Sequence, residues 1–206
     1  DRRYTATDLP SGVGSNGQAD AIFLYAMDTK TGASTILPIP RDTMVDIDLY
    51  SQSGKYVSSS KKQICLSFAY GDGKHSSCEN TVKSVSRLLY GVPINSYVAI
   101  DMDAVPILVD KVGGVPVTPL SDGEYGGKKY KAGKQTVLNG TDATAFLTER
   151  ELTLAGSLER MSRQKIFAES FWGNDYIESV TIPDTVTCID YGAFNQCEFL
   201  KEVYIP

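Results

Sequence analysis

An arginine and an aspartate lie together just after an apolar segment of the chain. Residues 36–40 read Ile-Leu-Pro-Ile-Pro, and Arg41 and Asp42 follow directly. Pro40 fixes its own φ and drives Ile39 towards extended geometry, so the chain leaves the predicted strand at a defined angle. A guanidinium presented there is always charged and suits a phosphate group. The segment therefore predicts an anion site, although a surface ion pair fits the same two residues.

The composition excludes several classes of protein. The chain has 206 residues, of which 42% are hydrophobic and 22% charged, which suits one large domain or one domain with a small appendage. Its formal net charge of -5 and the lack of a Lys/Arg stripe argue against a nucleic-acid binder. No apolar run is long enough for a membrane span, and no signal peptide opens the sequence. Because the chain begins without Met, we interpret it as a piece of a longer protein.

Two cysteines flank a glycine-rich turn. Cys65 and Cys78 lie 13 residues apart, a loop length that suits a disulfide, and we expect a bond between them. A zinc site would compete for these thiols, but the chain has a single histidine, His75, and no Cys-x-x-Cys pair. A disulfide would indicate an oxidising, extracytoplasmic location.

The elements that must position Arg41 alternate between strands and helices. The patterns predict strands over 21–27, 33–39, 97–102 and 115–117, and helices over 79–89, 104–112, 139–149 and 158–171. This order predicts an α/β (α+β) fold with a central mixed β-sheet flanked by helices. The Gly- and Lys-rich residues 121–137 are expected to form an exposed excursion, whereas Ala143, Phe146 and Leu147 should face inward from their helix.

The C-terminal residues follow a different pattern. Val-Thr-Ile-Pro at residues 180–183 recurs as Val-Tyr-Ile-Pro at residues 203–206, a spacing of 23 residues that is typical of a solenoid. The pattern resembles the leucine-rich repeats of BspA-like bacterial surface proteins. We therefore predict a first domain over residues 1–171 and a partial leucine-rich repeat over residues 172–206.

Several ordered segments of the first domain resemble the LytR-CpsA-Psr family. They are Asp1-Arg2-Arg3, Gln18-Ala19-Asp20, Ile39-Pro40-Arg41-Asp42-Thr43, Val109–Val115, Leu138-Asn139-Gly140 and Arg160-Met161-Ser162-Arg163-Gln164. Members of this family resemble phosphotransferases that move a glycopolymer from undecaprenyl pyrophosphate to peptidoglycan with Mg²⁺. They are extracytoplasmic proteins of mainly Gram-positive bacteria. The resemblance implies a cell-surface location and attachment to the membrane by an N-terminal anchor that this sequence lacks.

The resemblance also implies roles for individual residues. Cleavage of a pyrophosphate requires neutralisation of several oxygens, which arginines and a metal ion can provide. The implied Mg²⁺ ligands are Asp1 and Asp20. The implied phosphate clamp consists of Arg41, Arg150 and Arg160. Three further side chains would contact the substrate: Gln164, Asp42 and Arg3. Gln164 lies one helical turn beyond Arg160, so it could bond a phosphate oxygen or orient that arginine.

Two residues depart from the family pattern. Gln18 and Thr148 stand where the family usually has arginine, and Cys65 replaces an asparagine. Each lost charge-assisted phosphate contact is typically worth about 1.5 to 3 kcal/mol, so the departures predict weakened activity. The alternative is a non-catalytic surface binding or adhesion protein that retains a pyrophosphate-lipid pocket. Transfer to water by a pyrophosphatase would use the same residues.

Other conspicuous polar residues have structural interpretations. His75 has no Ser or Cys nucleophile pattern beside it, so we expect no catalytic role for it. Asp101 and Asp103 could hold a metal ion, but a helix N-cap at Asp103 is the preferred interpretation.

Overall fold

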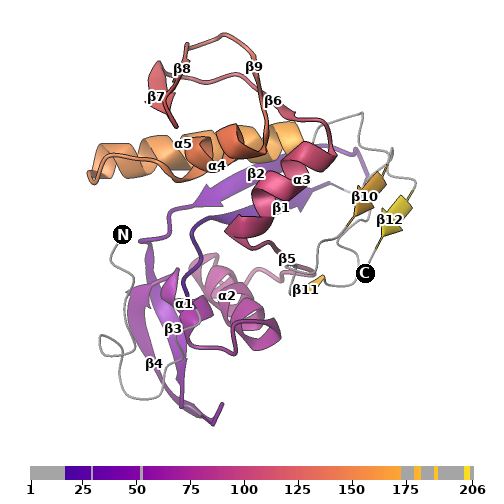
Figure 1. Cartoon of the computed structure of the whole chain (residues 1–206). Helices are drawn as coiled ribbons and strands as arrows, with labels where there is room; N and C mark the ends of the chain where they lie inside the picture. Colours follow the sequence, from indigo (N-terminus) through magenta and orange to yellow (C-terminus); the bar gives the residue numbers. More distant parts are fainter. Residues whose placement is uncertain are drawn as a thin grey trace. The chain divides into compact units, whose positions relative to one another are not determined.

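Short two-stranded sheets and helices alternate along the chain (Figure 1). The computed structural model describes residues 17–28, 30–51, 53–172, 179–181, 188–189 and 202–204. The predicted α/β class is confirmed, but the described strands pair in twos instead of forming one central mixed sheet. The chain divides into two units, one built mainly from residues 39–99 and the other mainly from residues 23–38 and 100–172.

The first unit contains a hairpin that the sequence did not predict. Strand β3 (Met44–Tyr50) pairs antiparallel with β4 (Tyr56–Gln63). Val45 and Ile47 are buried while the alternate positions of β3 begin exposed, as the period of two in a strand requires. The polar β4 shows no such alternation, which is why its sequence did not indicate a strand.

Two helices cover β3 in this unit (Figure 1). Helix α1 (Leu66–Ala69) leads into α2 (His75–Leu88), which begins four residues before its predicted start. The predicted strand at 97–102 is reduced to β5 (Val98–Ala99), which pairs antiparallel with β11 (Cys188–Ile189).

The second unit includes the predicted first hairpin. Strands β1 (Ile22–Met27) and β2 (Ser34–Ile39) form a two-stranded sheet. The turn between them is closed by a hydrogen bond from Asp28 N to Ala33 O at 2.8 Å. This hairpin is confirmed, with bounds within one residue of those expected.

The middle of the second unit joins short helices to short strands. A 3-10 turn, η1 (Met102–Ala104), precedes α3 (Val105–Lys111). Strand β6 (Val115–Val117) pairs antiparallel with β9 (Thr136–Leu138). Asp101 caps η1 by accepting from Asp103 N at 3.0 Å, so the cap lies at Asp101 and not at Asp103.

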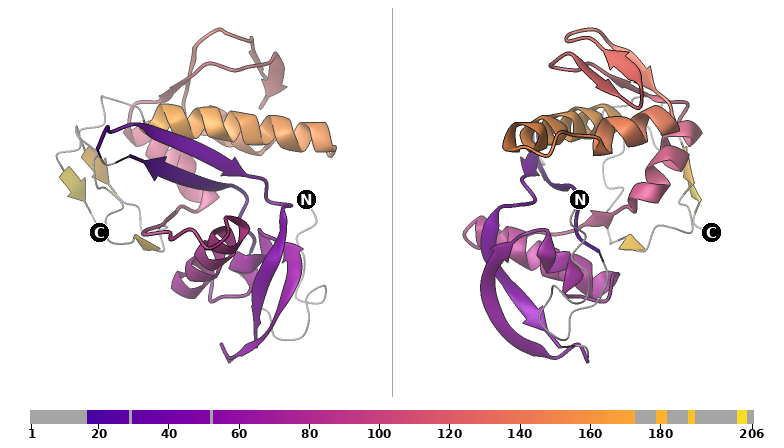
Figure 2. Two further views of the ribbon diagram at one scale, coloured as in Figure 1. Left: turned by 180° about the vertical axis from the view of Figure 1, so that it is seen from behind. Right: turned by 60° about the vertical axis from the view of Figure 1, so that its left-hand side comes forward.

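The expected exposed excursion is partly wrong. Strands β7 (Gly123–Tyr125) and β8 (Lys128–Tyr130) form a hairpin beside helix α4 (Gly140–Thr148) (Figure 2, right). Its lysines and glycines are largely exposed, but Tyr125 and Tyr130 are buried against Phe146. Burial raises the pKa of Tyr130 to about 12. Two aromatic anchors therefore attach a polar hairpin to the core.

The helices α4 (Gly140–Thr148) and α5 (Leu154–Trp172) lie side by side in the second unit (Figure 1). Asn139 caps α4 by accepting from Asp142 N at 2.8 Å. A Cβ at Gly140 would lie 2.3 Å from the Pro106 carbonyl oxygen, so only glycine fits there.

The core of the second unit brings these elements together. Its buried members are Val109, Val115, Val117, Tyr125, Tyr130, Leu138, Ala143, Phe146 and Leu147. The three residues predicted to face inward from α4 are among them, which confirms the period of that helix.

The strands near the C-terminus repeat the spacing of the sequence. Strand β10 (Ser179–Thr181) pairs parallel with β12 (Glu202–Tyr204), with Val180 opposite Val203. This register equals the 23-residue period, but the leucine-rich-repeat assignment and the boundary at residue 172 remain predictions. No helix in the described part of the chain has the length and apolar character needed to cross a membrane.

Candidate functional site

Arg41 lies in the turn that follows β2 in the chain. Thr43 N donates to Pro40 O at 2.9 Å and so closes the turn before β3. The carbonyl of Arg41 accepts from Cys65 N at 3.1 Å, and the carbonyl of Cys65 accepts from Ala19 N at 3.3 Å. These backbone bonds bring three segments of the first unit together, which places the residues around position 19 beside Arg41.

The guanidinium of Arg41 is held from two sides. Its Nη1 donates to Asp20 Oδ1 at 2.7 Å, and its Nη2 donates to Gln18 Oε1 at 2.5 Å. The Arg41 side chain is 14% exposed, whereas that of Asp20 is 46% exposed. The alternative interpretation of Arg41 and Asp42 as an ion pair is not what the structure shows, because Arg41 pairs with Asp20. Asp42 is exposed and accepts instead from Gln63 Nε2 at 2.9 Å.

The predicted disulfide is contradicted by the structure. Cys65 and Cys78 are both buried thiols, with no bond between them. The Cys65 Sγ lies 3.6 Å from Gln18 Oε1, to which it donates a hydrogen bond. Burial raises the pKa of the Cys65 thiol, while the nearby Arg41 opposes that shift. The Cys65 thiol thus belongs to the surroundings of Arg41, and these two cysteines give no indication of an oxidising location.

The fit of Mg²⁺ rests on a single described residue. Among the described residues, no three His, Cys, Asp or Glu side chains gather into a metal site. Asp1 and Arg3 lie outside the described residues. Asp20 is half-exposed and only one of its oxygens bonds Arg41, so it could offer an oxygen ligand. Mg²⁺ usually takes one or two carboxylates together with waters and substrate phosphates, which one such residue partly satisfies.

A second group of polar residues lies at the start of α5, in the second unit. Arg150 precedes the helix and is half-buried, and its Nη1 donates to Ser157 Oγ at 2.6 Å. The Ser157 hydroxyl in turn donates to Thr153 O at 3.0 Å. Thr153 also caps the helix by accepting from Gly156 N at 3.0 Å. Arg150 is thereby tied to the first turn of α5.

The segment from Arg160 to Gln164, which resembles the family and lies on α5, has a structural role as well. Arg163 Nε donates to Phe146 O at 2.8 Å, and Arg163 Nη2 donates to Glu149 O. Gln164 Nε2 donates to Leu147 O at 3.0 Å, and the residue is 7% exposed. Gln164 is thus bonded to the last turn of α4, and its contact with substrate stays a prediction. Arg160 is buried on the same helix.

Two other conspicuous residues are His75 and Thr148. His75 Nδ1 lies 2.5 Å from the hydroxyl of Tyr97, and its Nε2 lies 3.2 Å from Glu79. Thr148, which stands at an expected arginine position, donates to Thr144 O at 2.7 Å within α4.

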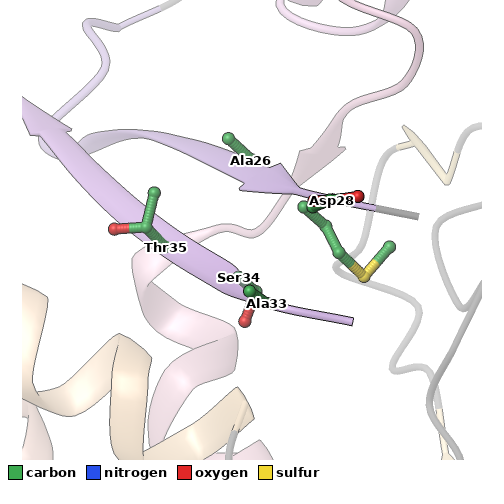
Figure 3. A pocket seen from close by; sticks show the side chains of 6 residues that line it. Ala26, Asp28, Ala33, Ser34 and Thr35 are labelled. Atoms are coloured by element: carbon green, nitrogen blue, oxygen red, sulfur yellow. The ribbon is translucent and has the colours of Figure 1, made fainter. Parts of the chain in front are cut away.

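A shallow depression lies at the turn end of the β1–β2 hairpin (Figure 3). It has a volume of about 420 Å³ and is lined by Ala26, Met27, Asp28, Ala33, Ser34 and Thr35. The Asp28 carboxylate accepts from Lys30 N at 2.8 Å, and this bond lowers the pKa of Asp28. None of the residues predicted to bind substrate lines it, so we assign it no chemical role.

The sequence pattern of the LytR_cpsA_psr family matches residues 1–174. The chain belongs to the LytR_cpsA_psr family. All of the described candidate residues, from Asp20 to Gln164, lie within the matched range. The family resemblance read from the ordered motifs is therefore confirmed.

Curated relatives within the LytR_cpsA_psr family are bacterial. The polyisoprenyl-teichoic acid–peptidoglycan teichoic acid transferase TagV of Bacillus subtilis is 30% identical over 158 residues, covering 74% of this chain and 37% of that protein. The corresponding transferase TagU of Bacillus subtilis is 30% identical over 152 residues, covering 74% of this chain and 45% of that protein. This chain thus spans less than half the length of either relative.

Solved structures of similar fold support the assignment to the LytR_cpsA_psr family. The crystal structure of Bacillus subtilis TagU aligns with a TM-score of 0.61 at 25% identity, covering 79% of this chain and 64% of that one. The Lin1025 protein of Listeria innocua aligns with a TM-score of 0.61 at 26% identity, covering 95% of this chain and 79% of that one.

Sequence reasoning missed three residues that the structure brings into these groups. Gln18 and Arg163 stand in segments that resemble the family, but the motifs give no partner for either residue, and no pattern singles out Ser157. Each acts through a bond to a residue or carbonyl distant in the sequence. Gln18 and Arg163 each lie inside a segment that resembles the family, which is the signal that the sequence offers for them.

Proposed function

We propose that this protein transfers a glycopolymer from a polyprenyl pyrophosphate carrier to peptidoglycan by phosphotransfer. The observation that carries the proposal is the arginine held at the β2–β3 turn, with Asp20 and Gln18 each bonded to one of its terminal nitrogens. The names of the family relatives support the donor and acceptor classes, because they are polyisoprenyl-teichoic acid–peptidoglycan teichoic acid transferases.

The chemistry asked of Arg41 is electrostatic. When the pyrophosphate linkage breaks, negative charge accumulates on the leaving phosphate, and a fixed guanidinium stabilises it without reorganisation. Arg41 has five N–H donors, of which Asp20 and Gln18 take one each, so others remain to meet phosphate oxygens. We propose that Arg150 and Arg160 also contact phosphate groups of the substrate.

We propose that Mg²⁺ assists the reaction. Asp20 is the described residue that would hold it, with Asp1 as the second carboxylate implied by the family. When bound, the ion would neutralise charge on the phosphate oxygens. We also propose that the protein acts outside the cytoplasmic membrane and is attached to it, because the lipid carrier lies in the membrane and peptidoglycan lies beyond it.

The test uses a soluble polyprenyl pyrophosphate-linked saccharide and a peptidoglycan fragment. Mass spectrometry would detect the covalent product with and without Mg²⁺, for the unaltered chain, Arg41→Lys and Arg87→Lys. Arg87 is the matched control, because it is an arginine of the same unit that pairs with Asp48. We expect product from the unaltered chain and from Arg87→Lys, and at least a hundredfold less from Arg41→Lys, since lysine loses the fork geometry.

Three other results would change the conclusion. Binding of the lipid without any product would favour the alternative, a surface binding protein that retains the lipid site. Release of polyprenyl phosphate together with free saccharide phosphate, without a peptidoglycan-linked product, would indicate transfer to water. Equal product from Arg41→Lys and the unaltered chain would contradict the role given to Arg41.

A further inference from the structure

Gln18 contacts Arg41 although the two residues lie 23 positions apart. Its Oε1 accepts from Arg41 Nη2 at 2.5 Å, and the same oxygen lies 3.6 Å from the Cys65 thiol. Asp20 holds the other terminal nitrogen, Nη1, at 2.7 Å. The two ends of the guanidinium fork are thus held by two different side chains, which defines the plane of the group.

We propose that Gln18 is a positioning residue that holds Arg41 ready for the pyrophosphate of the substrate. The proposal rests on the function given above, in that Arg41 contacts phosphate. An unrestrained arginine loses rotamer freedom when it binds, and a side chain already held in place loses less. The arginine that the family pattern expects at position 18 is therefore replaced by a residue that orients the remaining one.

The backbone around Gln18 explains how it reaches Arg41. Ala19 N donates to the Cys65 carbonyl at 3.3 Å, and Cys65 N donates to the Arg41 carbonyl at 3.1 Å. Cys65 is thus bonded to both segments and is 1% exposed. The buried residue fixes the spacing between the segment that carries Gln18 and the turn that carries Arg41.

The neutrality of Gln18 matters for an anionic ligand. Arg41 and Asp20 carry opposite formal charges, so the pair together with Gln18 has a net charge of zero. A carboxylate at position 18 would keep an acceptor for Arg41 Nη2 but would make the group negative. A neutral amide holds the guanidinium without adding repulsion towards phosphate. Loss of the Oε1 acceptor and gain of a negative charge at position 18 should therefore weaken phosphate binding for different reasons, and two different substitutions can separate them.

The experiment measures binding of geranyl pyrophosphate to the full chain by titration calorimetry. Gln18→Met keeps the length of the side chain but removes its acceptor, and Gln18→Glu keeps the acceptor but adds a charge. Gln135→Met is the control, because Gln135 is an exposed glutamine. We expect binding about tenfold weaker for Gln18→Met, weaker still for Gln18→Glu and unchanged for Gln135→Met.

A double variant separates positioning from a general structural effect. In the Arg41→Ala background, Gln18→Met should have no further effect on binding, because the residue that it orients is gone. Unfolding midpoints would confirm that each variant is folded.

Three results would overturn the proposal. Unchanged binding in both Gln18 variants, with binding lost in Arg41→Ala, would refute the role of Gln18 and leave the proposed function intact. Equal losses from Gln18→Met with and without Arg41 would show a structural effect only. Unchanged binding in Arg41→Ala would refute the phosphate role of Arg41 itself, and with it both proposals.

Discussion

Arg163 on α5 donates through Nε to the carbonyl oxygen of Phe146 at 2.8 Å, near the C-terminal end of α4. The last carbonyls of a helix lack partners within that helix, and Arg163 supplies donors to two of them, those of Phe146 and Glu149. Its guanidinium also lies 3.7 Å from the centre of the Tyr125 ring. One buried side chain thus connects α5, the end of α4 and the β7–β8 hairpin.

Replacement of Arg163 should destabilise the second unit. Arg163→Met leaves the two carbonyls of α4 without these donors and removes the contact with Tyr125, so we expect a loss of about 3 kcal/mol in the free energy of unfolding. Urea titration would measure it. Lys165→Met on the same helix is the control. Lys165 pairs with Glu169 at the surface, so its loss should cost less than about 0.5 kcal/mol.

Gln164 should contribute to stability and not to phosphate binding. Its amide nitrogen donates to Leu147 O, so Gln164→Glu would place a carboxylate oxygen against a carbonyl oxygen in a buried setting. We expect Gln164→Glu to cost about 2 kcal/mol or more in unfolding free energy, and Gln164→Met about 1 kcal/mol. Denaturant titration would measure both values. A loss of pyrophosphate affinity in a Gln164→Met variant of unchanged stability would instead support the contact between Gln164 and substrate that the family resemblance implies.

Ser157 should affect activity through Arg150. Because Arg150 Nη1 donates to the Ser157 hydroxyl, Ser157→Ala releases the arginine, and we expect about tenfold slower glycopolymer transfer. Ser157→Thr retains the hydroxyl and should restore the rate. Ser162→Ala is the control, since Ser162 likewise donates to a carbonyl one turn earlier on α5 but bonds no arginine in the described contacts. Equal rates for Ser157→Ala and Ser162→Ala would exclude this role.

The ion pair between Asp48 and Arg87 should make stability depend on acid pH. Hydrogen bonds from Arg87 lower the pKa of Asp48 below its ordinary value of 3.8, although burial opposes the shift. A lowered folded-state pKa stabilises the fold above pH 3.8, and this contribution disappears as the pH falls through the folded value. Arg87→Met should therefore lower the free energy of unfolding by about 1 to 2 kcal/mol at pH 7. The loss is this small because the Arg87 side chain is 41% exposed and solvent screens the ion pair.

The measurement is the difference in unfolding free energy between the unaltered chain and Arg87→Met across pH. The difference should be constant above about pH 5 and should narrow below about pH 4. Lys61→Met, on the neighbouring strand β4, is the control and should show no such narrowing. A difference that stays constant down to pH 2 would contradict the proposal that Arg87 lowers the pKa of Asp48.

Cys65 and Cys78 should react as two thiols. In a variant with Cys188→Ser and Cys197→Ser, a thiol reagent added under denaturing conditions without reductant should titrate two groups per chain. Reductant should leave the unfolding midpoint of that variant unchanged. Titration of no thiols would instead show that the bond predicted from the 13-residue spacing forms in solution.

The sequence by itself determined the elements whose signals are local. The apolar period of α4 correctly predicted that Ala143, Phe146 and Leu147 are buried. The sequence also predicted the turn between β1 and β2 and the end of α3 at its following glycines. Turns can be predicted in this way because a few adjacent residues determine their conformation. The ordered motifs identified the family and singled out Arg41. These features depend on residues that are adjacent in the chain, and the sequence gives the identity of those residues.

The tertiary structure alone decided which partner each functional side chain has. Strand β4 was missed because its polar residues show no alternation, and the burial of Tyr125 and Tyr130 was hidden by the Lys and Gly around them. Gln164 bonds a backbone carbonyl, and every residue has one, so no pattern of side chains could reveal that partner. Gln18 became part of the arginine site only because the fold brings two distant segments to Cys65. Such contacts depend on chain packing across long separations, which residue types and spacing do not encode locally.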